Sequence, residues 1–280
     1  MKGQKLTAEN LRSTYLKVPL LSITEAIQQV PNSWTHLSFC PISLPPYITL
    51  PSGWTTNDLA AIKVYTSPCR LYDALNEALR TEKINEIQPW FSYLKLFDTA
   101  INKIPPVKRR YCRGIRVAPD SSYKIGTVIT WWGVSSVSTN RSVCKNFASL
   151  HSGGCCGSLY DIKSISARNI TNYSLYPGEA ESILLPGTKV KIIKIELDSM
   201  SRVYVIDVEA ISPDSTDGTV TVKSTTTTTS TPPLDFTAVL PLSTATNGTV
   251  TVKSTTTTTS TPPLDFTAVL PLSTATSNKR

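Results

Sequence analysis

The hydrophobic pattern of the chain changes at Pro105-Pro106, and this change restricts the fold more than any other feature. Before the two prolines, leucines recur every fourth residue over 71–79 and a second apolar stripe covers 90–101, which predicts two amphipathic helices. Ser22 and Glu25 have the spacing of a capping box, which predicts another helix start. After the prolines, β-rich runs alternate with turns, at residues 113–118, 126–132, 159–165, 182–185, 189–197 and 202–210. Helices followed by strands indicate an α+β domain rather than a parallel βαβ sheet.

The last quarter of the chain contains a duplication of 30 residues. Residues 217–246 and 247–276 differ at their first position alone. A fixed period can indicate a solenoid, but two copies built around a threonine run and Pro-Pro cannot bury a continuous core. We therefore expect an N-terminal extension at residues 1–18 and a folded domain at 19–210. The domain would have a helical part at 19–106 and a β core at 107–210. A disordered Thr-rich repeat tail would follow at 211–280.

The charge balance favours anionic partners. The chain has 28 Lys and Arg against 20 Asp and Glu, a net charge of +8, which suits a dinucleotide pyrophosphate or an acidic protein surface. The densest basic run, residues 108–110, fits a solvated face and a phosphate contact equally well. No stretch approaches the roughly 18 apolar residues that cross a membrane, and polar residues interrupt every apolar run in residues 1–29. We expect no membrane span and no signal peptide, and a cytoplasmic location with secretion as the alternative.

The cysteines give no metal signal. Apart from one adjacent pair they lie far apart and lack the paired spacing of zinc ligands. We therefore expect no metal site, and free thiols in a reducing compartment, for Cys40, Cys69, Cys112, Cys144, Cys155 and Cys156.

Three short patterns fall in order on the expected strands or their edges. They are Arg113-Gly114 in YCRGIR, Ser136-Val137-Ser138 in WWGVSSVSTN, and Glu179-Ala180-Glu181 in YPGEAESILLPG. Each is weak by itself, since an Arg-Gly pair is usually a turn, and serines or paired glutamates usually a solvated loop. Together with LYDALNEALR and PWFSYLKLFDTAINKIP upstream, they resemble the R-S-E class of mono-ADP-ribosyltransferases, which includes vertebrate ecto-enzymes and clostridial-type toxins. The resemblance covers residues 19–208 and departs from the family at Val134, usually aromatic, and at Val137, usually Thr.

The resemblance implies a fold and an activity for residues 19–210. The fold would be an ADP-ribosyltransferase-like split mixed β-sheet core that binds NAD+, behind an N-terminal helical region. The activity would be transfer of ADP-ribose from NAD+ to an arginine side chain, with release of nicotinamide. NAD+ would be the co-substrate and no metal would take part. The partner would be an acceptor protein with an exposed arginine rather than nucleic acid, and we expect a monomer.

The resemblance also assigns roles at the NAD+ site. Loss of nicotinamide passes through an oxocarbenium-like state, which a nearby carboxylate stabilises, as in glycosidases. Glu181 would be that carboxylate and would accept a hydrogen bond from the ribose 2′-hydroxyl. Ser136 would position Glu181 and the ribose, with Ser138 beside it in the dinucleotide site. Arg113 would bind phosphate through its forked guanidinium. The backbone of Gly114 would pair with the nicotinamide amide, since a residue without Cβ permits close approach.

Other residues would meet the acceptor or the nicotinamide. In the family, Glu at position 179 goes with arginine as the acceptor, because a carboxylate can orient a guanidinium and help to remove its proton. Tyr173 and Tyr176 would lie in the loop that contacts the acceptor protein, and packing under a turn is the equal alternative. Phe147 would cover the nicotinamide or, alternatively, pack in the core.

Four other functions are alternatives to arginine ADP-ribosylation. A non-catalytic NAD-binding or protein-interaction module could keep the fold, but the signature residues are intact. An NAD glycohydrolase would use the same site without an acceptor. The diphtheria-toxin-like branch needs a His-Tyr-Glu set, and Ser or Cys hydrolases need a histidine base. His36 and His151 are the two histidines in the sequence, and neither opens a strand of the expected kind.

Overall fold

In the N-terminal half, polar capping residues determine where helices begin, and apolar stripes determine which faces are buried. The computed structural model describes residues 7–31, 40–45, 47–149, 156–164 and 166–211, so the tail beyond Ile211, with its expected disorder, lies outside them. Thr7, Ser22 and Thr55 each begin a helix with a capping box, and this confirms the start predicted at Ser22. The helices of this half are α1 (Ala8–Tyr15), α2 (Ile23–Gln28), α3 (Thr56–Tyr65), α4 (Leu71–Arg80), α5 (Ile84–Ile87) and α6 (Phe91–Asn102), with the short 3-10 helix η2 (Gln88–Trp90) before α6.

The helical half has its own apolar core. Leu71, Leu75 and Leu79 of α4 are fully buried, as their spacing predicts, and they join α6 in one cluster. Helix α1 belongs to the same core, because Leu11 and Tyr15 are also fully buried. Residues 8–15, which we expected in an extension, therefore form a helix packed into the domain. None of the helices in the described ranges is long and apolar enough to cross a membrane.

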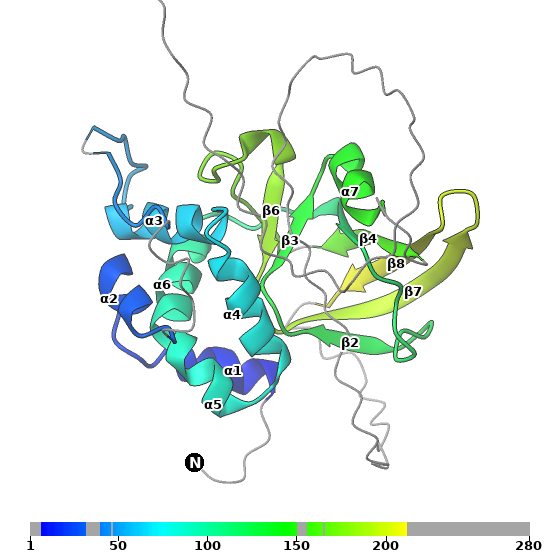
Figure 1. Ribbon diagram of the computed structural model, residues 1–280, viewed down its shortest axis with the longest axis horizontal. Helices are drawn as coiled ribbons and strands as arrows, with labels where there is room; N and C mark the ends of the chain where they lie inside the picture. The colour runs from blue at the N-terminus through cyan, green and yellow to red at the C-terminus, as the bar shows by residue number, and fades with distance from the viewer. Residues whose placement is uncertain (1–6, 32–39, 46, 150–155, 165, 212–280) are drawn as a thin grey trace, which may run out of the picture. The chain divides into compact units, whose positions relative to one another are not determined.

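The second half forms an eight-stranded sheet with the order β2-β7-β8-β4-β1-β3-β6-β5. The pairing of β4 with β8 is parallel and the other pairings are antiparallel, so the sheet is mixed. Helices α1 to α6 lie together beside it (Figure 1), which confirms the α+β prediction. The strands are β1 (Arg109–Ile115), β2 (Val128–Trp131), β3 (Ser135–Ser138), β4 (Gly157–Ser164), β5 (Arg168–Asn169), β6 (Glu181–Leu184), β7 (Thr188–Asp198) and β8 (Val203–Ala210).

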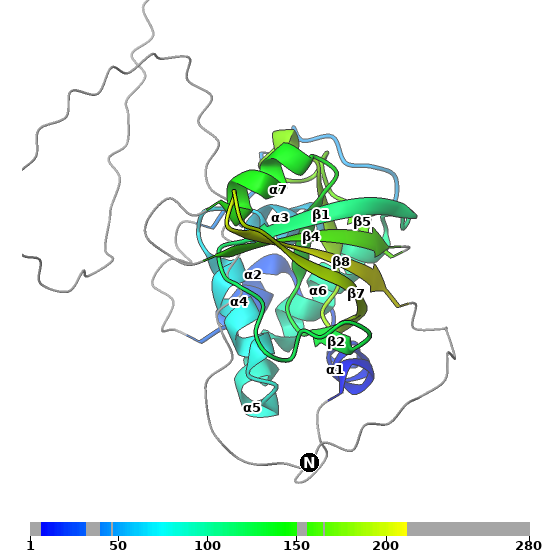
Figure 2. The ribbon, with the colours of Figure 1, turned by 90° about the vertical axis from the view of Figure 1, so that its right-hand side faces the viewer.

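Two features of the sheet bear on the site. Helix α7 (Arg141–Ala148) follows β3 and lies above β1 and β4 (Figure 2). Strand β7 has a register shift between Ile192 and Lys194. The sequence changes hydrophobic phase at Ile193, which predicts either a bulge or a strand covered on both faces. The bulge is the arrangement found, and it leaves the Ile193 side chain 46% exposed.

The expectation of free thiols is wrong for four cysteines. Cys40 bonds to Cys69, and Cys112 bonds to Cys144. The paired residues are 29 and 32 positions apart in sequence, but the fold brings their Cα atoms to 5.1 and 6.0 Å, within the range that a disulfide spans. Spacing along the chain could not show this proximity. Cys155 lies outside the described residues.

Candidate active site

Strand β1 presents successive residues to opposite sides of the sheet. Cys112 and Gly114 face α7: Cys112 is bonded to Cys144, and a Cβ on Gly114 would stand 1.9 Å from the carbonyl oxygen of Cys144. Gly114 is therefore the residue that lets the helix backbone approach the strand. Between them, Arg113 points away from α7, and its Nη1 donates a 2.6 Å hydrogen bond to the carbonyl of Ser136 on β3.

The three sequence patterns lie on three neighbouring strands. In the sheet β1 is followed by β3 and then by β6, where Cys112 pairs with Ser138 and Ser138 pairs with Glu181. The resemblance to the R-S-E class predicts this adjacency. The two departures from the family pattern, Val134 and Val137, are both 2% exposed, and they belong to the apolar core of the helical half and to that of the sheet, respectively.

Glu181 is a buried carboxylate at the start of β6. Its side chain is 1% exposed, and Ser174 Oγ donates to its Oε2 at 3.3 Å. Burial raises the pKa of Glu181 to about 7, while hydrogen bonding from Ser136 and Ser174 and the charge of Arg113 act in the opposite direction. Within the described residues, no hydrogen bond of good geometry reaches Oε1. Ser174 thus holds Oε2, while Ser136 also lies close enough to lower the pKa of this carboxyl.

Glu179 lies beside Glu181 at the end of the 3-10 helix η3 (Pro177–Glu179). Burial and the charge of Glu181 raise the pKa of Glu179 to about 7. Its backbone carbonyl accepts a 2.5 Å hydrogen bond from Ser138 Oγ. Between the two glutamates, Ala180 has φ +48°, in the left-handed region that few residues with a Cβ adopt. The turn that sets both carboxylates is therefore strained and is tied to β3.

Most of the predicted site residues line one small pocket. Its wall is formed by β1, β3, α7 and the Glu-Ala-Glu turn, and the predicted residues in its lining are Arg113, Gly114, Ser136, Ser138, Phe147, Glu179 and Glu181. Tyr173 and Tyr176 are not part of this lining. The Tyr173 ring stacks on Trp54 with the ring centres 4.4 Å apart, while Tyr176 is half-buried three residues before Glu179. His36 and His151 lie outside the described residues.

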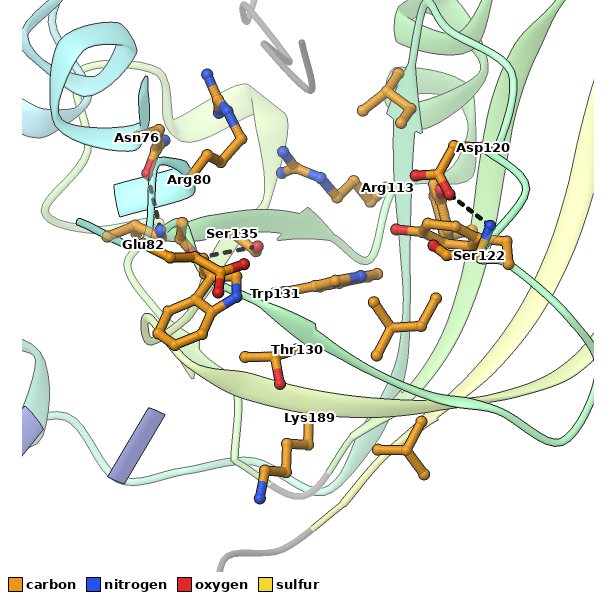
Figure 3. Close-up of a pocket in the computed structure, with 18 of the residues that line it drawn as sticks. Asn76, Arg80, Glu82, Arg113, Asp120, Ser122, Thr130, Trp131, Ser135 and Lys189 are labelled. Carbon is orange, nitrogen blue, oxygen red and sulfur yellow. Dashed lines mark hydrogen bonds between the residues drawn. The ribbon is translucent and has the colours of Figure 1, made fainter. Parts of the chain in front are cut away.

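A larger cavity adjoins the pocket through Arg113. It measures about 800 Å³, within the roughly 300–1,000 Å³ range of small-molecule sites. Arg113 and Arg80 reach toward the same space, with Trp131 below them (Figure 3). Burial lowers the pKa of Arg113, and the charge of Arg80 lowers it further. Lys189 also lines the cavity, so among the described residues three cationic side chains face it against two acidic ones, Glu82 and Asp120, and the excess of positive charge suits an anion.

Sequence reasoning missed two residues of this cavity, Asn76 and Arg80 on α4. Asn76 Oδ1 accepts a 2.8 Å hydrogen bond from the backbone N–H of Val134, so it fixes the chain just before β3. The signal was present in the sequence, because residues four apart on a helix share one face. In LYDALNEALR the leucines form the buried face of α4, and Asn76 and Arg80 form a polar pair beside that face.

The chain is similar in sequence to a curated protein over about half of its length. A curated relative from Mycobacterium avium (strain 104), named as the NAD(+)–arginine ADP-ribosyltransferase Mav, is 28% identical over 154 residues, which are 54% of this chain and 18% of that protein. The chain thus spans about a fifth of that relative's length.

Two solved structures are similar at lower identity. The ADP-ribosyltransferase Vis from Vibrio splendidus, in complex with agmatine, is 22% identical, with 73% of this chain and 93% of that chain covered and a TM-score of 0.49. The type III effector XopAI from Xanthomonas axonopodis pv. citri is 18% identical, with coverage of 57% and 69% and a TM-score of 0.46. Both TM-scores lie below 0.5, so membership rests on the family match.

That match is extensive. The family model described as NAD:arginine ADP-ribosyltransferase matches residues 2–213, well over half of the chain. It covers every helix and strand in the described residues, and it includes the three neighbouring strands that carry the signature. The chain therefore belongs to the NAD:arginine ADP-ribosyltransferase family.

Proposed function

We propose that this protein cleaves NAD+ between nicotinamide and ribose and transfers the ADP-ribose to an arginine side chain of an acceptor protein. The observation that carries the proposal is the Glu181 carboxylate, buried in a pocket with Arg113 and Ser136. One of its oxygens is held by serine and the other has no hydrogen bond of good geometry among the described residues. Family membership supports the choice of NAD+ and arginine as substrates.

The chemistry needs a negative charge where the ribose becomes cationic. Glu181 supplies that charge when it is ionised, and its burial strengthens the interaction because few water molecules screen it. Arg113, between the pocket and the larger cavity, binds the pyrophosphate, and Arg80 adds a second cation on the cavity side. The backbone at Gly114 pairs with the nicotinamide amide, and Phe147 covers the ring from α7. These contacts hold the bond to be broken beside Glu181.

Glu179 selects the acceptor in this proposal. It lies in the same pocket as Glu181, and within the described chain its Oε2 lacks a hydrogen bond. A guanidinium that enters the pocket would satisfy this oxygen with charge-assisted hydrogen bonds. At its raised pKa of about 7, the Glu179 carboxylate can also accept a proton from the attacking nitrogen near neutral pH.

The site of action is proposed from the cysteines. Two disulfides hold the domain, and disulfides persist mainly in oxidising compartments. We therefore favour secretion, the alternative in the sequence analysis, over the cytoplasm. The partner is a protein that exposes an arginine.

Labelled NAD+ tests the proposal when it is combined with agmatine as the arginine analogue. Wild-type protein is expected to release nicotinamide and form ADP-ribosyl-agmatine, and Glu181→Ala to do neither. Glu179→Gln is expected to lose transfer to agmatine but to keep some release of nicotinamide, because it retains Glu181. Equal rates for wild type and Glu181→Ala would overturn the proposal. Release of nicotinamide without any transfer by wild type would identify an NAD glycohydrolase instead.

A further inference from the structure

Ser174 connects the catalytic carboxylate to the loop before it. The side chain is 4% exposed. Its Oγ accepts a 3.0 Å hydrogen bond from the backbone N–H of Tyr176 and lies 3.3 Å from Glu181 Oε2. Because the Tyr176 N–H already occupies a lone pair of this oxygen, the hydroxyl proton is free to point at the carboxylate. The geometry fixes the direction of the hydrogen bond, with serine as donor and glutamate as acceptor.

The loop that carries Ser174 is anchored to the helical half. The backbone N–H of Leu175 donates to Thr66 Oγ1 at 3.1 Å, and Thr66 in turn donates to the carbonyl of Ile62 in α3. Tyr173, on the other side of Ser174, stacks on Trp54. The two neighbours of Ser174 in the loop are thus held by residues that precede β1, while the Ser174 hydroxyl contacts Glu181 of β6.

Charged and titratable groups face Glu181 from several elements. Arg113 on β1 favours the ionised carboxylate, whereas Glu179, in the preceding turn, repels it. Tyr65 at the end of α3 also interacts with its charge. Ser136 approaches from β3. From the loop, Thr171 Oγ1 donates to the backbone carbonyl of Glu181 at 3.5 Å, whereas Ser174 Oγ donates to its carboxylate. Removal of the Ser174 hydroxyl therefore removes the hydrogen bond from this loop to the carboxylate.

We propose that Ser174 is a positioning residue of the ADP-ribosyltransferase reaction, whose hydroxyl holds the Glu181 carboxylate toward the pocket and couples it to the loop at 171–176. This inference rests on the proposed function. It adds a second, loop-borne serine to the Ser136 that the sequence pattern identifies. A hydrogen bond to a carboxylate also stabilises its ionised form, so Ser174 extends activity toward lower pH.

Ser174→Ala is the direct test. We expect kcat for nicotinamide release at pH 7 to fall about tenfold, the effect of one hydrogen bond to a charged group. The KM for NAD+ should change little, since Ser174 lines neither the pocket nor the larger cavity and acts on the dinucleotide site through Glu181. The acidic limb of the kcat profile should move to higher pH, so that the deficit shrinks in alkaline buffer. Ser174→Thr, which keeps a hydroxyl, should keep the wild-type profile.

Ser158→Ala is the matched control, because Ser158 is equally buried and donates to a backbone carbonyl of Val117 away from Glu181. Its pH profile should match that of wild type. Should Ser174→Ala not fold, Ser174→Cys replaces it, with nearly the same size and a weak donor. A loss of activity in the serine variants that is equal at every pH would overturn the inference. Wild-type protein that cleaves no NAD+ would refute the proposed function itself, a distinguishable outcome.

Discussion

Replacing Glu181 with glutamine is expected to stabilise the folded protein at alkaline pH while it removes activity. Burial raises the pKa of this carboxyl from 4.5 to about 7, because an ionised group loses hydration inside the protein. The folded-state pKa exceeds the unfolded-state pKa. Stability from this group is therefore greatest below pH 4.5 and is lost as pH rises through about 7. The difference between the two pKa values corresponds to about 3 kcal/mol in the free energy of unfolding.

A glutamine avoids this cost without leaving a hole. Its carbonyl can accept the hydrogen bond from Ser174. Its amide group takes the place of the buried Oε1, and the N–H donors that it adds there offset part of the gain. Glu181→Gln should therefore be more stable than wild type by up to about 3 kcal/mol at pH 9, with the advantage fading toward pH 4.

Urea unfolding of both proteins from pH 4 to pH 9 measures this difference. The control is Glu86→Gln, since Glu86 lies exposed on α5, and we expect it to change stability by less than about 0.5 kcal/mol. A Glu181→Gln protein that is less stable than wild type at pH 9 would refute the reasoning. So would a stability difference that does not vary with pH, because it would point to packing instead of ionisation.

Two further predictions concern the contact between β1 and α7. Gly114→Ala should destabilise the protein by about 1–3 kcal/mol or more and reduce NAD+ cleavage, because its Cβ would stand 1.9 Å from a backbone oxygen of Cys144. The control is Gly178→Ala, whose Cβ would meet nothing within 4 Å in the described chain. Equal melting temperatures for the two variants would contradict the steric argument. Replacing Cys112 and Cys144 by serine should cost about 3–4 kcal/mol, since the disulfide closes a loop with a sequence separation of 32. Thermal unfolding with and without a reductant measures this effect, and an unchanged melting temperature would show that the bridge does not constrain the unfolded chain.

Local patterns predicted the helices and strands in which buried apolar residues recur at a regular spacing along the sequence. The leucines of α4 lie on one face and are all fully buried, so their spacing alone located the helix. The phase change at Ile193 likewise marked the bulge in β7. Helix α1 was missed although a signal existed: Thr7 and Asn10 form a capping box, and Leu11 and Tyr15 follow at a helical spacing of four.

Contacts between distant segments could not be predicted in the same way. The partner of Cys112 depends on where α7 packs, and α7 itself is short and capped by a single asparagine, Asn140. Ser174 seven residues before Glu181 looked like any loop serine, because its value comes from the turn that folds it back. The resemblance to a family located the three signature strands, but it assigned no role to any residue of α4, whose Asn76 and Arg80 reach the cavity only once the helix has docked.

Few residue types and no change of length can be tolerated in the middle of β1. Cys112 forms a disulfide with Cys144 of α7, Arg113 donates a hydrogen bond to Ser136 and is proposed to bind the dinucleotide, and Gly114 leaves room for the backbone of α7. Insertion or deletion of one residue in the strand would exchange its two faces and remove these three contacts together. Changes in dinucleotide or acceptor preference among related chains should therefore arise around this strand, in the loop at 171–176 and along α4, while its length stays constant.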